Sequence, residues 1–116
     1  MAKENIIIDK TFEFSLRIIE LYKYLTIEKK EYILSKQLLK SATSIGANVE
    51  EVTAAQSRKD FLSKMSIASK EARETTYWLR LLIKSDYITY DGILNNSIEI
   101  KKIITSIVKT TSAQKD

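Results

Sequence analysis

Six side chains suited to binding nucleic acid fall along one line of the helix predicted for residues 58–84. At about 100° per residue, five cations lie within about 60° of this line, which also carries a tyrosine and lies opposite the apolar side of the helix. Aligned cations can follow a phosphate backbone while an aromatic ring stacks on a base. The pattern fits a solvated charged surface, which is the more common origin of such a face, and a nucleic-acid-binding surface is the alternative. This basic face consists of Lys59, Lys70, Arg73, Tyr77, Arg80 and Lys84.

The net charge of the chain is concentrated in its second half. Residues 1–56 contain 8 Lys and Arg against 8 Asp and Glu, whereas residues 57–116 contain 11 against 7, so the whole excess of +4 lies after residue 56. Lys101, Lys102 and Lys109, on the last predicted helix, can extend the basic face. This asymmetry favours an anionic partner.

The residues that are absent exclude several kinds of enzyme. With no His and no Cys, the chain cannot build structural zinc sites, cysteine nucleophiles, Ser-His triads or the Glu-x-x-His ligands of di-iron bundles. The two glycines, Gly46 and Gly92, are too far apart for a phosphate-binding loop. We therefore expect a protein that is not an enzyme and has no metal or cofactor.

A second line on the same predicted helix mixes apolar and acidic side chains. Ile67, Trp78 and Leu81 share it with Glu71 and Glu74. This mixture is too polar for the centre of a monomer and too apolar for bare solvent, so it suits an interface between subunits. The alternative is that the first or fourth predicted helix covers Trp78 within one subunit.

An apolar seam at alternating spacings of three and four residues determines the architecture. One part of the seam precedes the predicted turn near Ser57 and the other part follows it. The pattern therefore predicts two long antiparallel helices that share one apolar contact. With 0 Pro and 2 Gly, little interrupts long helices, and we predict an all-α, single-domain, antiparallel up-and-down four-helix bundle. The seam consists of Leu38, Ala42, Ile45, Val49, Val52, Phe61, Met65, Ala68, Ala72, Thr75, Leu79 and Leu82.

The four helices are predicted over residues 9–25, 35–56, 58–84 and 91–110, with ends uncertain by ~2–4 residues. Candidate helix caps are Asp9 for the first, Ser35 for the second, Ser57 with Asp60 for the third, and Thr89 or Asp91 for the fourth. The tail from residue 110 to 116 is expected to fray.

The first predicted helix has a broad apolar face that includes both Phe12 and Phe14, and we expect two neighbouring elements to cover it.

Two features of the second predicted helix indicate contacts with other helices. Gly46 lies in a run of small residues, which lets another helix approach closely, either within the bundle or from another subunit. Taking the turn as a mirror point places Glu51 opposite Lys64, which predicts an interhelical ion pair.

The sequence contains no apolar run near the ~20 residues of a membrane span, and the apolar stretch at residues 6–8 is too short for a signal peptide. We therefore expect a cytoplasmic protein without a membrane partner.

Three segments carry a resemblance to a known family: SKQLLKSATSIGANVEE at 35–51, AAQSRKDF at 54–61 and KEARETTYWLRLL at 70–82. The chain resembles the bacterial four-helix-bundle proteins first noticed as reading frames within intervening sequences of large-subunit ribosomal RNA. More distantly, it is similar to the accessory variability proteins of diversity-generating retroelements. The resemblance implies a homopentamer, and the retroelement branch implies binding of nucleic acid and a reverse transcriptase through a basic surface. It implies no catalytic residues.

Three functions remain open from the sequence. The first, which we prefer, is a self-associating scaffold or accessory factor that displays repeated basic faces to RNA or to an RNA-handling protein, so that weak contacts add together. The second is a purely structural self-associating protein without a nucleic-acid partner. The third is a helical nuclease or nucleotidyltransferase partner of toxin–antitoxin type, which the absence of histidine disfavours.

Overall fold

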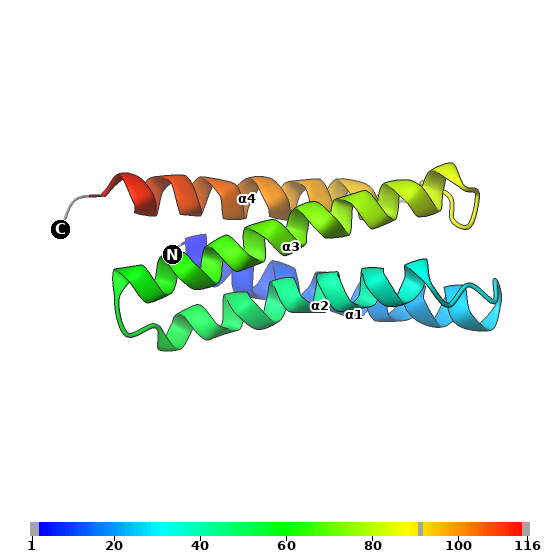
Figure 1. The fold of residues 1–116 in the computed structure, drawn as a ribbon, viewed down its shortest axis with the longest axis horizontal. Helices are drawn as coiled ribbons and strands as arrows, with labels where there is room; N and C mark the ends of the chain where they lie inside the picture. The colour runs from blue at the N-terminus through cyan, green and yellow to red at the C-terminus, as the bar shows by residue number, and fades with distance from the viewer. Residues whose placement is uncertain (1–2, 91, 115–116) are drawn as a thin grey trace.

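The computed structural model describes residues 3–90 and 92–114. Within these residues the chain forms four helices, α1 (Lys3–Ile27), α2 (Leu34–Glu51), α3 (Arg58–Lys84) and α4 (Ile93–Ala113), and one short 3₁₀ turn, η1 (Val52–Ala54). The helices run alternately up and down in a bundle of 51 × 24 × 21 Å (Figure 1). None of the described helices is long and apolar enough to cross a bilayer. The predicted all-α four-helix bundle is confirmed.

The apolar seam forms the contact between α2 and α3. Its members from Leu38 to Val49 are at most 1% exposed, as are Met65, Leu79 and Leu82 on α3. Because the seam repeats every three to four residues, one side of each helix is buried along most of its length, with Phe61 at the start of α3 only partly buried. α1 and α4 complete the core with their own buried side chains. These are Ile7, Phe14, Ile18 and Leu25 of α1 and Ile93, Ile100, Ile104 and Ile107 of α4.

Buried hydroxyl groups link α3 to both of its neighbours. The Thr75 hydroxyl donates to the Ser41 hydroxyl of α2 at 2.9 Å. The hydroxyls of Thr76 and Ser97 are 2.7 Å apart and join α3 to α4. A buried hydroxyl without a partner destabilises the fold, so these pairs favour one alignment of the helices along the bundle.

Gly46 is buried where α2 packs against α1. A Cβ atom built at this position would lie 3.3 Å from the Ser15 hydroxyl oxygen and 3.6 Å from the carbonyl oxygen of Thr11. The helix backbones approach so closely that a larger side chain would have to displace its neighbours. The close contact of Gly46 is therefore made within the chain, by α1.

The beginnings of α1 and α2 differ from the prediction. α1 begins at Lys3, so Asp9 lies inside the helix and caps nothing. α2 begins at Leu34, and the predicted cap Ser35 is instead a buried residue whose hydroxyl donates to the Glu31 carbonyl at 2.7 Å. The capping acceptor is the Glu31 carboxylate, which receives the first backbone N–H groups of the helix. Both predicted caps are wrong: α1 extends to residues before Asp9, and the Glu31 side chain from the preceding loop accepts the first N–H groups of α2.

At the turn between α2 and α3, the start of α3 agrees with the prediction. Ser57 caps α3, and its hydroxyl accepts the backbone N–H of Asp60 at 3.0 Å. The Asp60 carboxylate accepts the N–H of Gln56 at 3.1 Å, so the acid closes the turn one residue before the cap. Ser57 and Asp60 are confirmed as the start signal of α3.

The ends of α4 lie further along the chain than predicted. The N-cap is Gly92, whose φ of 95° suits glycine, rather than Thr89, and Asp91 lies outside the described residues. The helix continues to Ala113, so the tail expected to fray is helical over residues 110–113, and residues 115–116 of it lie outside the described residues. The extension follows from packing, because Thr111 lies one turn beyond Ile107 on the buried side of the helix.

The predicted ion pair between Glu51 and Lys64 does not form. Glu51 follows the buried Val49 by two residues, about 200° around α2, and its side chain is exposed. The mirror-point argument gave the position along the helix but not the direction of the side chain, and Glu51 points into solvent instead of toward α3.

Candidate nucleic-acid interface

The basic face lies on the outer side of α3, away from the core. All six of its side chains are exposed, and Tyr77 retains 50% of its surface. The seam residues of α3 are buried on the opposite side of the same helix, so their burial determines which way the cations point. The structure therefore leaves every member of this face accessible to a ligand.

The cations of the basic face have no carboxylate partners in the described part of the chain. The two ion pairs found there involve other residues, Lys10 with Glu99 at 3.2 Å and Lys23 with Glu20 at 3.3 Å. Arg73 instead donates to the Ser69 hydroxyl at 3.1 Å. Like charges gathered on one face repel one another, and a bound polyanion would relieve that repulsion.

The acidic residues of α3 lie on its other flank. Thr75 marks the flank that faces α2, and Asp60, Glu71 and Glu74 lie within about 100° of it. The pKa of Glu71 is raised, mainly by burial. The charge of Glu74 raises this pKa further, whereas the charges of Lys70 and Lys40 lower it. Since Lys40 belongs to α2, the acidic flank is the one that faces α2. The acids of α3 thus lie toward its α2-facing side, with Glu74 about 40° from Lys70 at the border of the basic face.

Three lysines of α4 form a second cationic surface. Lys102 and Lys109 are exposed and Lys101 is half-buried. Together with Thr105, Ser106 and Thr110 they line a shallow hollow on the outer side of the helix. Cations and hydroxyl groups are the side chains that most often contact phosphate oxygens.

The three residues proposed for an interface between subunits are only partly covered by their own chain. Ile67 is 42% exposed, whereas Trp78 and Leu81 are half-buried. Trp78 packs against the core from the α2-facing flank of α3, about 60° from Thr75, which differs from the expected cover by the first or fourth helix. Its ring meets the Tyr77 ring edge to face, with centroids 5.1 Å apart and an interplanar angle of 67°.

The Trp78 Nε1 atom is buried without a hydrogen-bond partner. An unsatisfied buried N–H group is uncommon in a folded protein. Trp78 therefore combines partly exposed apolar surface with a buried, unpaired donor on the α2-facing flank of α3.

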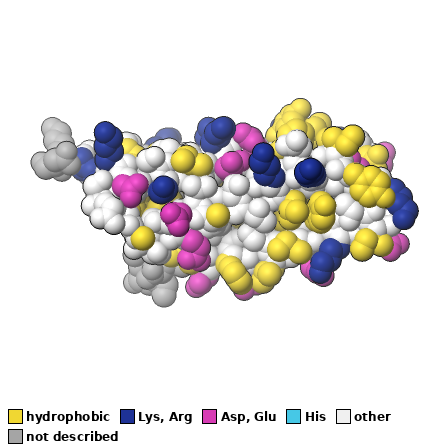
Figure 2. Space-filling model, turned by 60° about the horizontal axis from the view of Figure 1, so that its bottom comes forward, with side chains coloured by type: hydrophobic (Ala, Val, Ile, Leu, Met, Phe, Trp, Pro, Cys, Tyr) yellow, Lys and Arg dark blue, Asp and Glu magenta, His cyan; other side chains and the backbone are white. Residues whose placement is uncertain are grey.

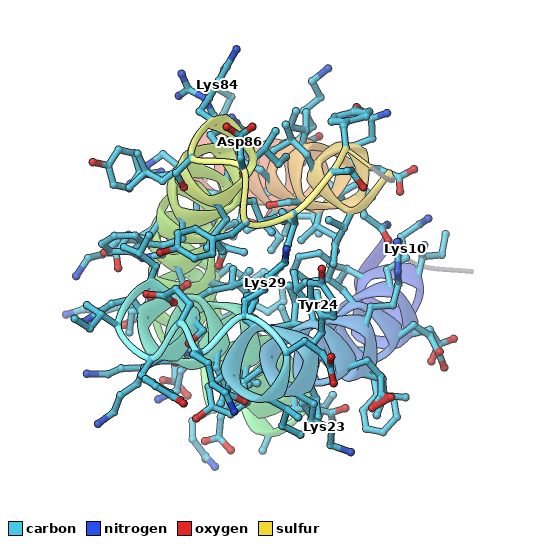
Figure 3. The ribbon with its side chains drawn as sticks, turned by 90° about the vertical axis from the view of Figure 1, so that its right-hand side faces the viewer. Lys10, Lys23, Tyr24, Lys29, Lys84 and Asp86 are labelled. Atoms are coloured by element: carbon cyan, nitrogen blue, oxygen red, sulfur yellow. The ribbon has the colours of Figure 1, made fainter. Side chains whose placement is uncertain are left out.

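A cleft at one end of the bundle was not anticipated from the sequence. It has a volume of about 530 Å³ and lies between the last turns of α1, with Lys29 just beyond them, and the α3–α4 connection. Figure 3 looks onto this end and shows Lys29 reaching over Tyr24, where its Nζ atom lies 5.9 Å from the ring centroid. The cleft is lined by equal numbers of cations and acids, Arg17 and Lys29 against Glu20 and Asp86. No sequence motif marks it, because one wall comes from the end of α1 and the other from the distant α3–α4 connection.

Comparisons with known proteins agree with this fold. A family model described as "23S rRNA-intervening sequence protein" matches residues 3–106. The chain is also similar to the crystal structure of a protein with unknown function from the S23 ribosomal protein family of Bacteroides thetaiotaomicron, with 54% sequence identity and a TM-score of 0.89. That similarity covers 93% of this chain and 99% of the other. None of the curated proteins matches. The resemblance carried by residues 35–82 is thus confirmed, and the chain belongs to the 23S rRNA-intervening sequence protein family.

Proposed function

We propose that this chain is a non-catalytic, self-associating cytoplasmic protein that binds RNA through the basic face of α3. The observation that carries the proposal is the row of five exposed cations, none of which forms a salt bridge among the described residues. Such a row supplies the electrostatic part of nucleic-acid binding, which is independent of base sequence. Both family descriptions refer to ribosomal RNA or to a ribosomal protein, so RNA is the first polyanion to test.

Reversing three charges of the basic face tests this function. In the variant with Lys70→Glu, Arg73→Glu and Arg80→Glu, we expect RNA affinity at low salt to fall by at least about tenfold, because three phosphate contacts become repulsive. Binding to total cellular RNA can be measured by electrophoretic mobility shift. Circular dichroism should show unchanged helical content, since all three side chains are exposed.

The matched control reverses three charges elsewhere on the surface. The variant with Lys30→Glu, Lys36→Glu and Lys40→Glu has the same net charge, and all three lysines are exposed in the α1–α2 connection or on α2. It should keep most of the affinity. Equal losses in the two variants would mean that RNA responds only to net charge, and no RNA binding by the unmodified chain would select the purely structural function.

Exposed apolar side chains support the proposal of self-association. Figure 2 shows hydrophobic side chains gathered over the half of one face that lies toward the α1–α2 connection. Large apolar residues with much of their surface exposed are uncommon on soluble monomers when they form a continuous patch, and such patches usually mark contacts between proteins. The large exposed residues of the bundle include Phe12, Leu16, Ile33, Ile67 and Tyr77.

Charge placed within the candidate interface should dissociate the oligomer. We expect Ile67→Glu to shift the chain toward monomer in light scattering, because a carboxylate buried between subunits would lose its hydration. Ile67 is exposed in the single chain, so the variant should fold normally. Trp78→Ala should act in the same direction, although this side chain also packs against the core.

A second exposed apolar residue serves as the control for position. Leu16 is 46% exposed on α1, and Leu16→Glu introduces the same charge on another side of the bundle. Dissociation by Leu16→Glu but not by Ile67→Glu would move the interface to α1. A chain that is monomeric without any substitution would contradict self-association.

A further inference from the structure

One wall of the cleft at the end of the bundle is a single side of α1. Arg17, Leu21 and Tyr24 line the cleft at spacings of four and three residues, so they project from the same side of the helix. Arg17 donates to the Asn96 side chain, which shows that this side of α1 faces α4. Lys29 lies just beyond the end of α1, and its ammonium group reaches back over the Tyr24 ring. This wall therefore presents two cations and an aromatic ring.

The opposite wall is the α3–α4 connection, which contributes apolar and aromatic surface. Tyr87 and Ile88 are half-buried there, and Ile93 at the start of α4 is buried. The cleft volume of about 530 Å³ lies within the range of about 300–1,000 Å³ that is usual for sites of small organic ligands. Such sites combine an apolar lining with a few charged or polar groups, and this cleft has both.

Backbone hydrogen bonds hold both walls in place. Asp86 adopts a left-handed conformation with φ of 67°, and the Tyr87 N–H donates to the Leu82 carbonyl at 3.0 Å, which closes the end of α3. On the other side, the Lys29 N–H donates to the Tyr24 carbonyl at 3.3 Å. A ligand would therefore meet a backbone that needs little further ordering, which lowers the entropic cost of binding.

The cations of the cleft are more available to a ligand than its acids. The Glu20 carboxylate is paired with Lys23 at 3.3 Å, and Figure 3 shows the Asp86 side chain pointing outward, away from Lys29. Arg17 and Lys29 form no salt bridge among the described residues. The charges left to face a ligand inside the cleft are therefore positive, which favours an anion.

We propose that this cleft binds a small aromatic anion, with its ring against Tyr24 and Tyr87 and its anionic group held by Lys29 and Arg17. The Lys29 ammonium lies 5.9 Å from the centroid of the Tyr24 ring, so a ligand ring on this tyrosine brings its anionic group within reach of the lysine. An exposed cation–π contact is weak, and a charge-assisted hydrogen bond to an anion can replace it. This inference goes beyond the proposed function, because the cleft shares no residue with the basic face of α3.

Two probes distinguish the sources of such an anion. Adenosine 5′-monophosphate represents nucleotides, and indole-3-acetate represents aromatic carboxylates. Each is titrated into the isotope-labelled chain while the backbone amide NMR signals are followed, and we expect saturable shifts at the cleft residues with at least one probe. The tighter probe identifies the source. Its neutral counterpart, adenosine or indole-3-acetamide, should bind at least about tenfold more weakly, because it cannot make charged contacts with the two cations.

A substitution of Lys29 tests the anion contact. Lys29→Gln should weaken binding of the charged probe about tenfold and leave its neutral counterpart unaffected, because only the contact with the anion is lost. The side chain is exposed, so the variant should fold normally. The matched control is Lys30→Gln, which changes the net charge equally at an exposed neighbour outside the cleft and should retain the affinity.

Substitutions of Tyr24 test the ring contact. Tyr24→Ala should weaken binding of both the charged probe and its neutral counterpart by about fivefold or more, whereas Tyr24→Phe should retain the affinity, because stacking needs the ring and not the hydroxyl.

Three results would overturn this site. They are the absence of saturable shifts with both probes, shifts that follow the basic face of α3 instead of the cleft, and equal losses of affinity in Lys29→Gln and Lys30→Gln. None of them bears on RNA binding by α3, which the charge-reversal variants of that helix test separately.

Discussion

Replacing Phe14 by alanine is expected to lower the free energy of unfolding by about 3–5 kcal/mol. Phe14 is 1% exposed and is the largest of the fully buried side chains of the bundle. It belongs to the same core cluster as the seam residues of α2 and α3, so its removal would leave a cavity among several helices rather than at the surface. Urea unfolding followed by circular dichroism measures the loss.

Phe12 is the matched control, two residues earlier in the same helix. It is 57% exposed, and Phe12→Ala should change the free energy of unfolding by less than about 1 kcal/mol. If self-association covers Phe12, its contribution would depend on protein concentration, so both variants are compared across a dilution series. Equal destabilisation by the two substitutions at every concentration would contradict the packing described for α1.

The contrast between Phe12 and Phe14 shows how far periodicity predicts burial. Both residues belong to the broad apolar face expected to be covered by two neighbouring elements. The structure covers one side of that face with α2 and α4 and leaves Phe12 outside. A hydrophobic pattern identifies the residues available for burial, but the angle at which neighbouring helices approach decides which of them are reached.

The basic face was predictable because its direction depends on the helix that carries it. Once the seam is buried, residues about half a turn away must face solvent, and 100° per residue is enough to identify them. The position of the α4 lysines relative to the basic face cannot be predicted in this way, because it depends on how far along the bundle α4 lies beside α3. That position depends on the contact between Thr76 and Ser97, and no local pattern identifies these two residues as partners.

The start of α2 was mispredicted for a different physical reason. A cap prediction assumes that the residue just before the helix supplies the acceptor, which favoured Ser35. In the structure Lys30 adopts a left-handed conformation with φ of 56°, and the following Glu31 turns its side chain back over the helix start. The charged cluster at residues 28–31 therefore contains a structural residue that composition alone does not distinguish from its solvated neighbours.

The Glu31 carboxylate accepts three backbone N–H groups at the beginning of α2. The donors are Ile33 at 3.0 Å, Leu34 at 2.9 Å and Ser35 at 2.7 Å. An anion here also interacts favourably with the positive end of the helix dipole. Burial raises the pKa of Glu31, but the hydrogen bonds from Leu34, Ser35 and Ile33 together outweigh it, so the net pKa is lowered from the usual 4.5.

Glu31→Ala should lower the free energy of unfolding by about 2–3 kcal/mol at neutral pH, because three N–H groups at a partly buried helix start lose a charged acceptor. Glu31→Gln should cost less, since the amide keeps one acceptor oxygen without the charge. The exposed Glu28, in the same connection, gives the control Glu28→Gln, which should have almost no effect.

The effect of Glu31→Gln should also depend on pH in a defined direction. A carboxylate whose pKa is lower in the folded state contributes its full stabilisation above its unfolded pKa, near 4.5, and loses it as the pH falls toward the lowered folded value. The difference in unfolding free energy between the unmodified chain and Glu31→Gln should therefore be constant from about pH 6 to pH 7 and shrink below about pH 4.5. Urea unfolding across this range measures it, and a difference that stays the same in acid would show that the Glu31 charge does not hold the start of α2.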